Sequence, residues 1–134
     1  MAISIIPPPR PDWSLEAIAR LGNLFRRRIT VDSAAEAPLN INDSQIESGF
    51  IAVFTRIAVE NETSDYTRIR IGVVSGGIFH PHEEEQNPNE DTLYWTSEEF
   101  YLSEGENIRL ELTGTTNADR INVYVEGYRA RVIS

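Results

Sequence analysis

From Gly49 to its C-terminus, the chain consists of short segments in which apolar and polar residues alternate, separated by polar turns. The clearest segments are "TRIRIGVV", "NIRLELTG" and "RINVYVEG". A period of two is typical of a β-strand with one buried face, and strands spaced by roughly ten residues are typical of antiparallel all-β folds. We therefore expect a mainly β protein, an antiparallel and jelly-roll-like β-sandwich. The pattern leaves a single small barrel open as an alternative.

The apolar members of these segments form the predicted core. The segment "GFIAVFTRIAVEN" is apolar on both parities, which predicts that both of its faces are buried over its first half. Gly127 is predicted to mark a bulge in the last strand. The core residues expected to be buried are Ile51, Val53, Ile57, Ile69, Ile71, Val73, Ile108, Leu110, Leu112, Ile121, Val123 and Val125.

The first 48 residues have a different pattern. "PPPRP" favours an extended arm, and "DWSLEAIARLG" predicts a short helix with an apolar face. Apolar residues then alternate with arginines, which favours a strand from about Arg27, and the following segment "DSAAEAPLNINDSQIESG" is predicted to be an irregular connection. We therefore predict an N-terminal arm, short helix and linker over residues 1–48, and a β-sandwich domain over residues 49–134.

The charge of the chain is strongly negative and unevenly distributed. The net charge is −9, and all 12 basic residues are arginines. Residues 1–31 carry +3 and the remainder carries −12. An acidic body repels phosphates, so we expect no nucleic-acid partner. No apolar run approaches the ~20 residues of a membrane span, so we expect no membrane partner. The chain has no cysteine, which excludes disulfides and thiolate ligands.

The stretch "GGIFHPHEEEQNPNED" holds both histidines, His80 and His82. A His-x-His pair beside carboxylates suggests a metal site of the cupin type, but the acids follow at once and the chain has no third histidine. Pro81 and the turn-forming residues that follow favour a solvated acidic loop. No nucleophile elbow or phosphate-binding glycine loop is present. We therefore expect no catalytic, cofactor or metal site, and no enzyme activity.

The aromatic cluster "LYWTSEEFY" includes Tyr94 and Trp95, which alternation places on opposite faces of a strand. Three roles remain open for this cluster: core packing, a protein interface or a platform for a glycan.

Two stretches resemble small β-sandwich virion proteins of tailed phages. They are "EEFYLSEGENIRLELTGTTNADRINVYVEGYRARV", from Glu98 to Val132, and the hairpin-like "GFIAVFTRIAVENETSDYTRIRIGV". The resemblance implies a capsid decoration (cement) protein, a head fibre or another virion accessory protein of a bacteriophage. It also implies a location in the virion after synthesis in the host cytoplasm, a major capsid or other virion protein as partner, and a homo-oligomer, with a trimer favoured. The alternative is a carbohydrate- or receptor-binding module of a fibre or tail, using Trp95 and Tyr94 or the histidine loop.

The N-terminal residues 1 to about 31 are predicted to be the assembly element. They are basic while the body is acidic, and the apolar face of the expected helix must be buried somewhere. Whether it docks on its own sandwich or on a neighbour stays open. The predicted partner-binding residues are Trp13, Leu15, Ile18, Leu21, Phe25, Arg26, Arg27 and Arg28.

Overall fold

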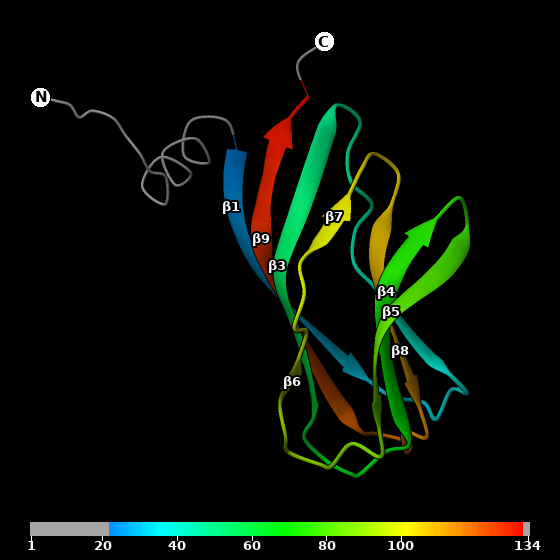
Figure 1. The fold of residues 1–134 in the computed structure, drawn as a ribbon. Helices are drawn as coiled ribbons and strands as arrows, with labels where there is room; N and C mark the ends of the chain where they lie inside the picture. Colours follow the sequence, from blue (N-terminus) through cyan, green and yellow to red (C-terminus); the bar gives the residue numbers. More distant parts are fainter. Residues whose placement is uncertain (1–21, 133–134) are drawn as a thin grey trace, which may run out of the picture.

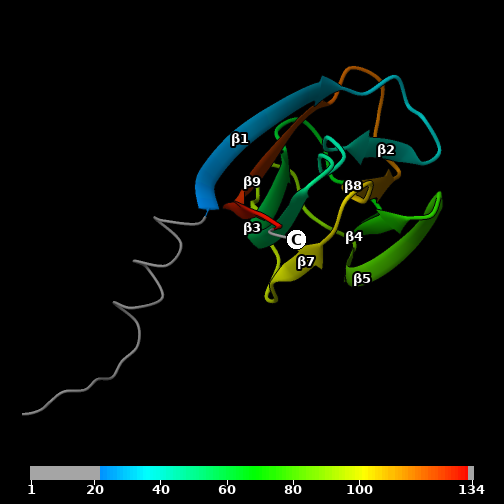
Figure 2. The same cartoon turned by 90° about the horizontal axis from the view of Figure 1, so that it is seen from above.

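Nine strands make up two antiparallel sheets that pack face to face in the computed structural model, which describes residues 22–132 (Figure 1). The first sheet has the order β1-β9-β3-β6, with β7 also paired to β3, and the second has the order β2-β8-β4-β5. Figure 2 shows the two layers from above. The strands are β1 (Gly22–Asp32), β2 (Leu39–Asn42), β3 (Phe50–Asn61), β4 (Arg68–Ser75), β5 (Ile78–Gln86), β6 (Tyr94–Trp95), β7 (Phe100–Leu102), β8 (Asn107–Thr113) and β9 (Arg120–Arg131).

The strand pairs are nested in the sequence. β4 pairs with β5, β3 with β6 and β7, β2 with β8, and β1 with β9. This is the connectivity of a jelly roll, in which a long hairpin is rolled into two sheets, with β6 and β7 together taking the place of one strand. The prediction of a mainly β, jelly-roll-like sandwich is confirmed.

Residues 22–48 contribute two strands to the sandwich, which corrects the boundary predicted at Gly49. β1 pairs with β9 along its whole length because Phe25, Ile29 and Val31 turn one apolar side inward. Leu39 and Ile41 are buried on β2, inside the segment predicted to be irregular. The predicted strand near Arg27 is therefore confirmed and begins earlier, whereas the helix predicted from "DWSLEAIARLG" lies outside the described residues, apart from Gly22.

The predicted burial of the core residues is confirmed except at Ile51 of β3. A bulge at Thr55 separates the pairs Phe54–Gly127 and Arg56–Glu126. Because the extra residue reverses the alternation, Ile57 points into the core whereas Ile51 points outward and is 47% exposed. Val53 is buried, but among the outward-facing residues and not in the core cluster.

Gly127 explains why the bulge lies where it does. A Cβ atom at this position would lie 2.0 Å from the backbone oxygen of Val53, which no side chain allows. The predicted bulge is thus present, but its extra residue is in β3 and not in β9. β4 and β5 repeat the arrangement, with Gly72 opposite a bulge at His82 and a Cβ atom at Gly72 only 2.0 Å from the oxygen of His80.

Candidate interaction surfaces

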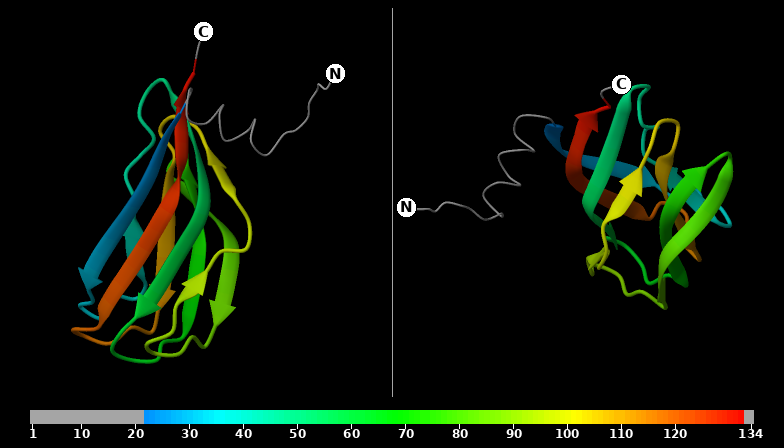
Figure 3. Two further views of the ribbon diagram at one scale, coloured as in Figure 1. Left: turned by 90° about the vertical axis from the view of Figure 1, so that its left-hand side faces the viewer. Right: turned by 45° about the horizontal axis from the view of Figure 1, so that its top comes forward.

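The two sheets differ in what they expose to solvent. Seven large hydrophobic side chains are exposed within residues 22–132, and six of them lie on the outward surface of β1, β9, β3, β6 and β7 or on the segments flanking these strands. We call this surface the apolar face; the left panel of Figure 3 looks onto β1, β9 and β3 from the outside. The six side chains are Leu24, Ile51, Leu93, Trp95, Tyr101 and Val132.

Strand register arranges the apolar face in three cross-strand rows. Residues that are direct partners on neighbouring strands form each row. The upper row is Leu24, Tyr128, Val53 and Tyr101; the charged row is Arg26, Glu126 and Arg56; the lower row is Arg28, Tyr124, Ala58 and Trp95. Leu24 is 76% exposed and Tyr101 is 71% exposed, so the two ends of the upper row are apolar surface in contact with water.

The charged row contains one ion pair and one arginine stacked on an aromatic ring. Arg26 Nε donates to Glu126 Oε2 at 3.1 Å. The guanidinium of Arg56 lies 5.1 Å from the ring centroid of Trp95, and Arg56 has no ion-pair partner among the described residues. Arg56 is therefore a positive charge without an ion-pair partner among residues 22–132, although Glu126 is its direct cross-strand neighbour on β9.

A depression of about 230 Å³ lies where the charged and lower rows meet. It is lined by Arg56, Ala58, Glu60, Leu93, Tyr124 and Glu126. The Tyr124 hydroxyl donates to Glu60 Oε2 at 2.8 Å, and this hydrogen bond is the main reason that the pKa of Tyr124 is raised above its ordinary value. The hydroxyl therefore remains a proton donor, which holds the ring of Tyr124 beside the depression.

The outward surface of β2, β8, β4 and β5, which we call the polar face, carries mostly charged and amide side chains, and the ring of Phe79 on this face lies 5.7 Å from the guanidinium of Arg109. Arg70 Nε donates to Glu84 at 2.8 Å, and Arg109 Nε donates to Asn42 Oδ1 at 2.8 Å. Arg68 lies 3.7 Å from Glu111. Polar side chains on this face thus find partners on the neighbouring strands.

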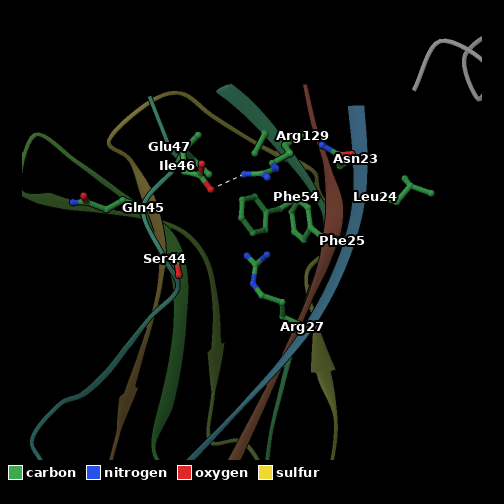
Figure 4. Close-up of a pocket in the computed structure, with 11 residues that line it drawn as sticks. Asn23, Leu24, Phe25, Arg27, Ser44, Gln45, Ile46, Glu47, Phe54 and Arg129 are labelled. Carbon is green, nitrogen blue, oxygen red and sulfur yellow. Dashed lines mark hydrogen bonds and ion pairs between the residues drawn. The ribbon is translucent and has the colours of Figure 1, made fainter. Parts of the chain in front are cut away.

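A cavity of about 380 Å³ opens at the end of the sandwich, between the start of β1 and the β2–β3 connection (Figure 4). Phe25 packs edge-on against Phe54 with ring centroids 5.2 Å apart. The guanidinium of Arg27 lies 4.6 Å from the Phe25 ring and pairs with the buried carboxylate of Asp43. Arg129 closes the other end of the cavity through a 2.8 Å bond to Glu47.

The structure separates the residues predicted to bind a partner. Phe25 and Arg27 point inward, Arg26 and Arg28 lie on the apolar face, and the remaining four lie outside the described residues. The arginines therefore do not form one docking surface, because successive residues of a strand point to opposite sides. Those four are Trp13, Leu15, Ile18 and Leu21.

The histidines lie on the edge strand β5, which corrects the prediction of a loop. Pro81 is tolerated there because an edge strand has a free side. Glu83 reaches across to the β6–β7 connection, where it accepts hydrogen bonds from the backbone N–H groups of Ser97 at 3.0 Å and Glu98 at 3.1 Å.

Residues 22–132 contain no group of three or more histidine and acidic side chains placed to hold a metal ion. The same residues include no helix with the length and apolarity needed to cross a bilayer.

Sequence reasoning missed the apolar face itself. Tyr94 and Trp95 do point to opposite sides: Tyr94 packs against the core and Trp95 is 59% exposed. The remaining exposed residues come from strands far apart in the sequence. The run of apolar residues on both parities of β3 predicted that both faces of its first half are buried, and this holds for Val53 but not for Ile51, which is exposed.

No protein-family model matches this chain, and no curated protein matches it. Its fold is similar to that of several solved structures. One is a protein of Bacillus endospore appendages, described as disulfide-linked pili, with 12% identity, a TM-score of 0.44, and coverage of 84% of this chain and 91% of the other. A second belongs to the Gt strain of infectious bursal disease virus, with 7% identity, a TM-score of 0.43, and coverage of 81% of this chain and 32% of the other.

A third is the N-terminal cellulose-binding domain of a β-1,4-glucanase of Cellulomonas fimi, with 14% identity, a TM-score of 0.37, and coverage of 80% of this chain and 78% of the other. With identities and TM-scores this low, no function is transferred from any of the three. The chain is a β-sandwich on the evidence of its own strand pairing.

Proposed function

We propose that this chain is a non-enzymatic structural protein that acts by binding other protein surfaces. The apolar face carries this proposal. Its exposed aliphatic and aromatic side chains are spread over a sheet surface and not gathered in a deep cavity, which suits an extended protein contact more than a small substrate. The charged row interrupts the apolar residues with side chains that can set the register of a partner.

More specifically, we propose a virion accessory protein of a tailed phage, of the capsid decoration or cement type. The resemblance of residues 98–132 to such proteins supports this role, and so does a jelly-roll architecture, which is common in viral capsid domains. Residues 1–21 would attach the protein to the capsid, through the apolar residues Trp13, Leu15, Ile18 and Leu21. After synthesis in the host cytoplasm the protein would reside in the virion.

Purified virions test the role directly. Gradient-purified particles of the phage that encodes the chain should contain it in a fixed ratio to the major capsid protein, as measured by quantitative mass spectrometry. Its absence from such particles would contradict the virion role.

The attachment is tested separately with particles that lack the protein: a full-length Trp13→Ser, Ile18→Ser variant should no longer bind them. The matched control is Ile78→Ser, which removes an exposed apolar side chain from the other sheet. A double variant that binds as well as wild type would contradict the attachment.

A carbohydrate- or receptor-binding module is the second candidate, favoured by the exposed Trp95 beside the 230 Å³ depression. Aromatic rings and nearby carboxylates suit a sugar. However, Arg56 already covers one side of the Trp95 ring, and Tyr94 is turned inward. A glycan array probed with the wild type and with Trp95→Ala distinguishes this candidate: binding that is lost in the variant would favour it over the structural role.

A further inference from the structure

We propose that the apolar face binds a second copy of this chain, in a dimer whose two-fold axis runs along the strands between β9 and β3. The inference deepens the proposed function, because it names the partner of the apolar face. It rests on the order of side chains within the three rows, which is complementary to itself under this symmetry.

A two-fold dimer uses the same surface on both subunits, so each residue must match the residue that the axis brings over it. An axis along the strands keeps every row at its own level and exchanges the strands. β9 of one copy then faces β3 of the other, and β1 faces β6 and β7. Two sheets packed in this way lie ≈ 10 Å apart with strands nearly aligned.

The charged row selects this axis over the alternative. With the axis along the strands, Glu126 faces Arg56 of the second copy, and Arg56 faces Glu126 of the second copy. With the axis across the strands and along the charged row, Glu126 would face its own counterpart and Arg56 would face its own counterpart. Like charges brought together in a dry interface cost binding free energy, whereas opposite charges fix the register. The charged row therefore favours the axis along the strands.

The lower row agrees with the same axis. Tyr124 lies over Ala58 of the second copy, so a large ring faces a small side chain that lines the depression of about 230 Å³. Arg28 lies opposite Trp95 of the second copy, and an arginine over an indole ring is a favourable contact. Large side chains thus face small ones and cations face rings.

The upper row supplies the exposed apolar area. Leu24 faces Tyr101 of the second copy, and these are the two most exposed large hydrophobic side chains of residues 22–132. Both would leave water in the dimer. A surface that binds a different protein does not need to be complementary to itself, so this self-complementary pattern favours a second copy of the chain as the partner.

A mixing experiment with two charge reversals tests the proposal. In Glu126→Arg, two arginines face each other in the dimer; in Arg56→Glu, two glutamates do. Each variant alone should dimerise more weakly than wild type by on the order of tenfold or more. An equimolar mixture should restore a heterodimer, because the arginine introduced at position 126 of one chain meets the glutamate introduced at position 56 of the other, and the second contact is of native type. Native mass spectrometry and sedimentation at micromolar concentrations resolve homodimers from heterodimers.

The mixture separates the interface from effects within one chain. Glu126 also pairs with Arg26 of its own chain, and another molecule cannot repair that loss. Glu84→Arg is the matched control, because it breaks an equivalent pair with Arg70 on the polar face and should leave dimerisation unchanged. A monomeric or trimeric wild type, or a mixture that forms no heterodimer, would overturn the proposal. A monomer that is still found in virions would overturn only this inference, and a dimer absent from virions would overturn only the virion role.

Discussion

The apolar and polar faces of this protein use the same backbone arrangement and expose opposite chemistry. In an antiparallel sandwich, each sheet buries one face and turns the other to water, so both outward surfaces are expected to be polar. The polar face follows this rule, with arginines paired to carboxylates and amides across the strands. The apolar face departs from it at six exposed side chains. Exposed apolar patches on a folded protein are typical of interaction surfaces, and the proposed dimer would cover these side chains.

Both sheets rest on one shared core, and a change at Leu110 tests this with the largest expected effect. Leu110 is fully buried on β8, behind the polar face. Leu110→Ala should lower the free energy of unfolding by about 2–5 kcal/mol, because it leaves a cavity between the sheets. Chemical denaturation monitored by circular dichroism measures the loss. Glu111→Ala, one residue away and facing outward, is the control and should cost about 0.5 kcal/mol or less. Equal effects of the two changes would contradict the assignment of inner and outer faces.

Asp119 ties the two sheets together where the chain crosses between them, and its loss should have the next largest effect. Its carboxylate accepts hydrogen bonds from Ser64, from Asn61 at 2.9 Å and from the Thr116 N–H at 2.7 Å. Burial raises the pKa of Asp119, but these three bonds outweigh burial and leave the pKa below its ordinary value. Asp119→Asn should cost about 1–3 kcal/mol at neutral pH, since one acceptor oxygen is replaced by an NH2 group and the remaining hydrogen bonds are no longer charge-assisted.

The same residue gives a pH dependence with a definite sign. Because the folded pKa is lower than the unfolded one, the stability that Asp119 contributes is present above its ordinary pKa of 3.8 and is lost as the pH falls below that value. Unfolding free energies of the wild type and of Asp119→Asn should therefore converge as the pH is lowered from neutral into this acid range. Parallel curves would show that the carboxylate charge is not what stabilises this end of the sandwich.

A pair of matched serine variants sharpens the contrast between the faces. Tyr101 on the apolar face and Ile78 on β5 are both largely exposed, at 71% and 62%. If the apolar face is covered by a second copy, Tyr101→Ser should lower the apparent stability by about 1 kcal/mol at high protein concentration, whereas Ile78→Ser should change it by about 0.5 kcal/mol or less. Melting temperatures measured over a wide range of protein concentration reveal the difference. Identical concentration dependence in both variants would argue against a covered apolar face.

Local patterns in the sequence predicted the sandwich because alternation is a local property of the chain. The inward positions of β4, β8 and β9 follow directly from it. Ile51 was misplaced because the bulge at Thr55 reverses the parity of β3, and a bulge depends on the approach of Gly127 from a distant strand. The segment before Gly49 was misassigned because few of its residues are apolar, although Leu39 and Ile41 are buried by pairing with β8.

The rows of the apolar face could not be predicted for a related reason. The upper row joins Leu24, Val53, Tyr101 and Tyr128, which come from four strands spread over most of the described chain. Their alignment is fixed by strand register, and register depends on turns, bulges and the burial of the opposite face. The sequence predicts that Arg26, Arg27 and Arg28 act together, but successive side chains of a β-strand point to opposite faces of the sheet, so Arg27 points away from the other two. Composition can therefore indicate that a surface exists, whereas register decides which residues share it.

The smallest effect is expected at the histidines, which lie at the edge of the sheet that bears the polar face. His80 and His82 are both exposed on β5, and His82 occupies the bulge opposite Gly72, with its ring 5.3 Å from that of Phe100. Replacing both with alanine removes no core side chain, and the backbone bulge is held by Gly72 and by the bonds of Glu83 to the β6–β7 connection. The free energy of unfolding should therefore change by less than ~0.5 kcal/mol, as at ordinary surface positions.

The same variant separates a surface role from a metal role: zinc titrated into wild-type protein should leave its melting temperature unchanged. A zinc-dependent rise that disappears in the double variant would make β5 a metal-binding edge and overturn this expectation.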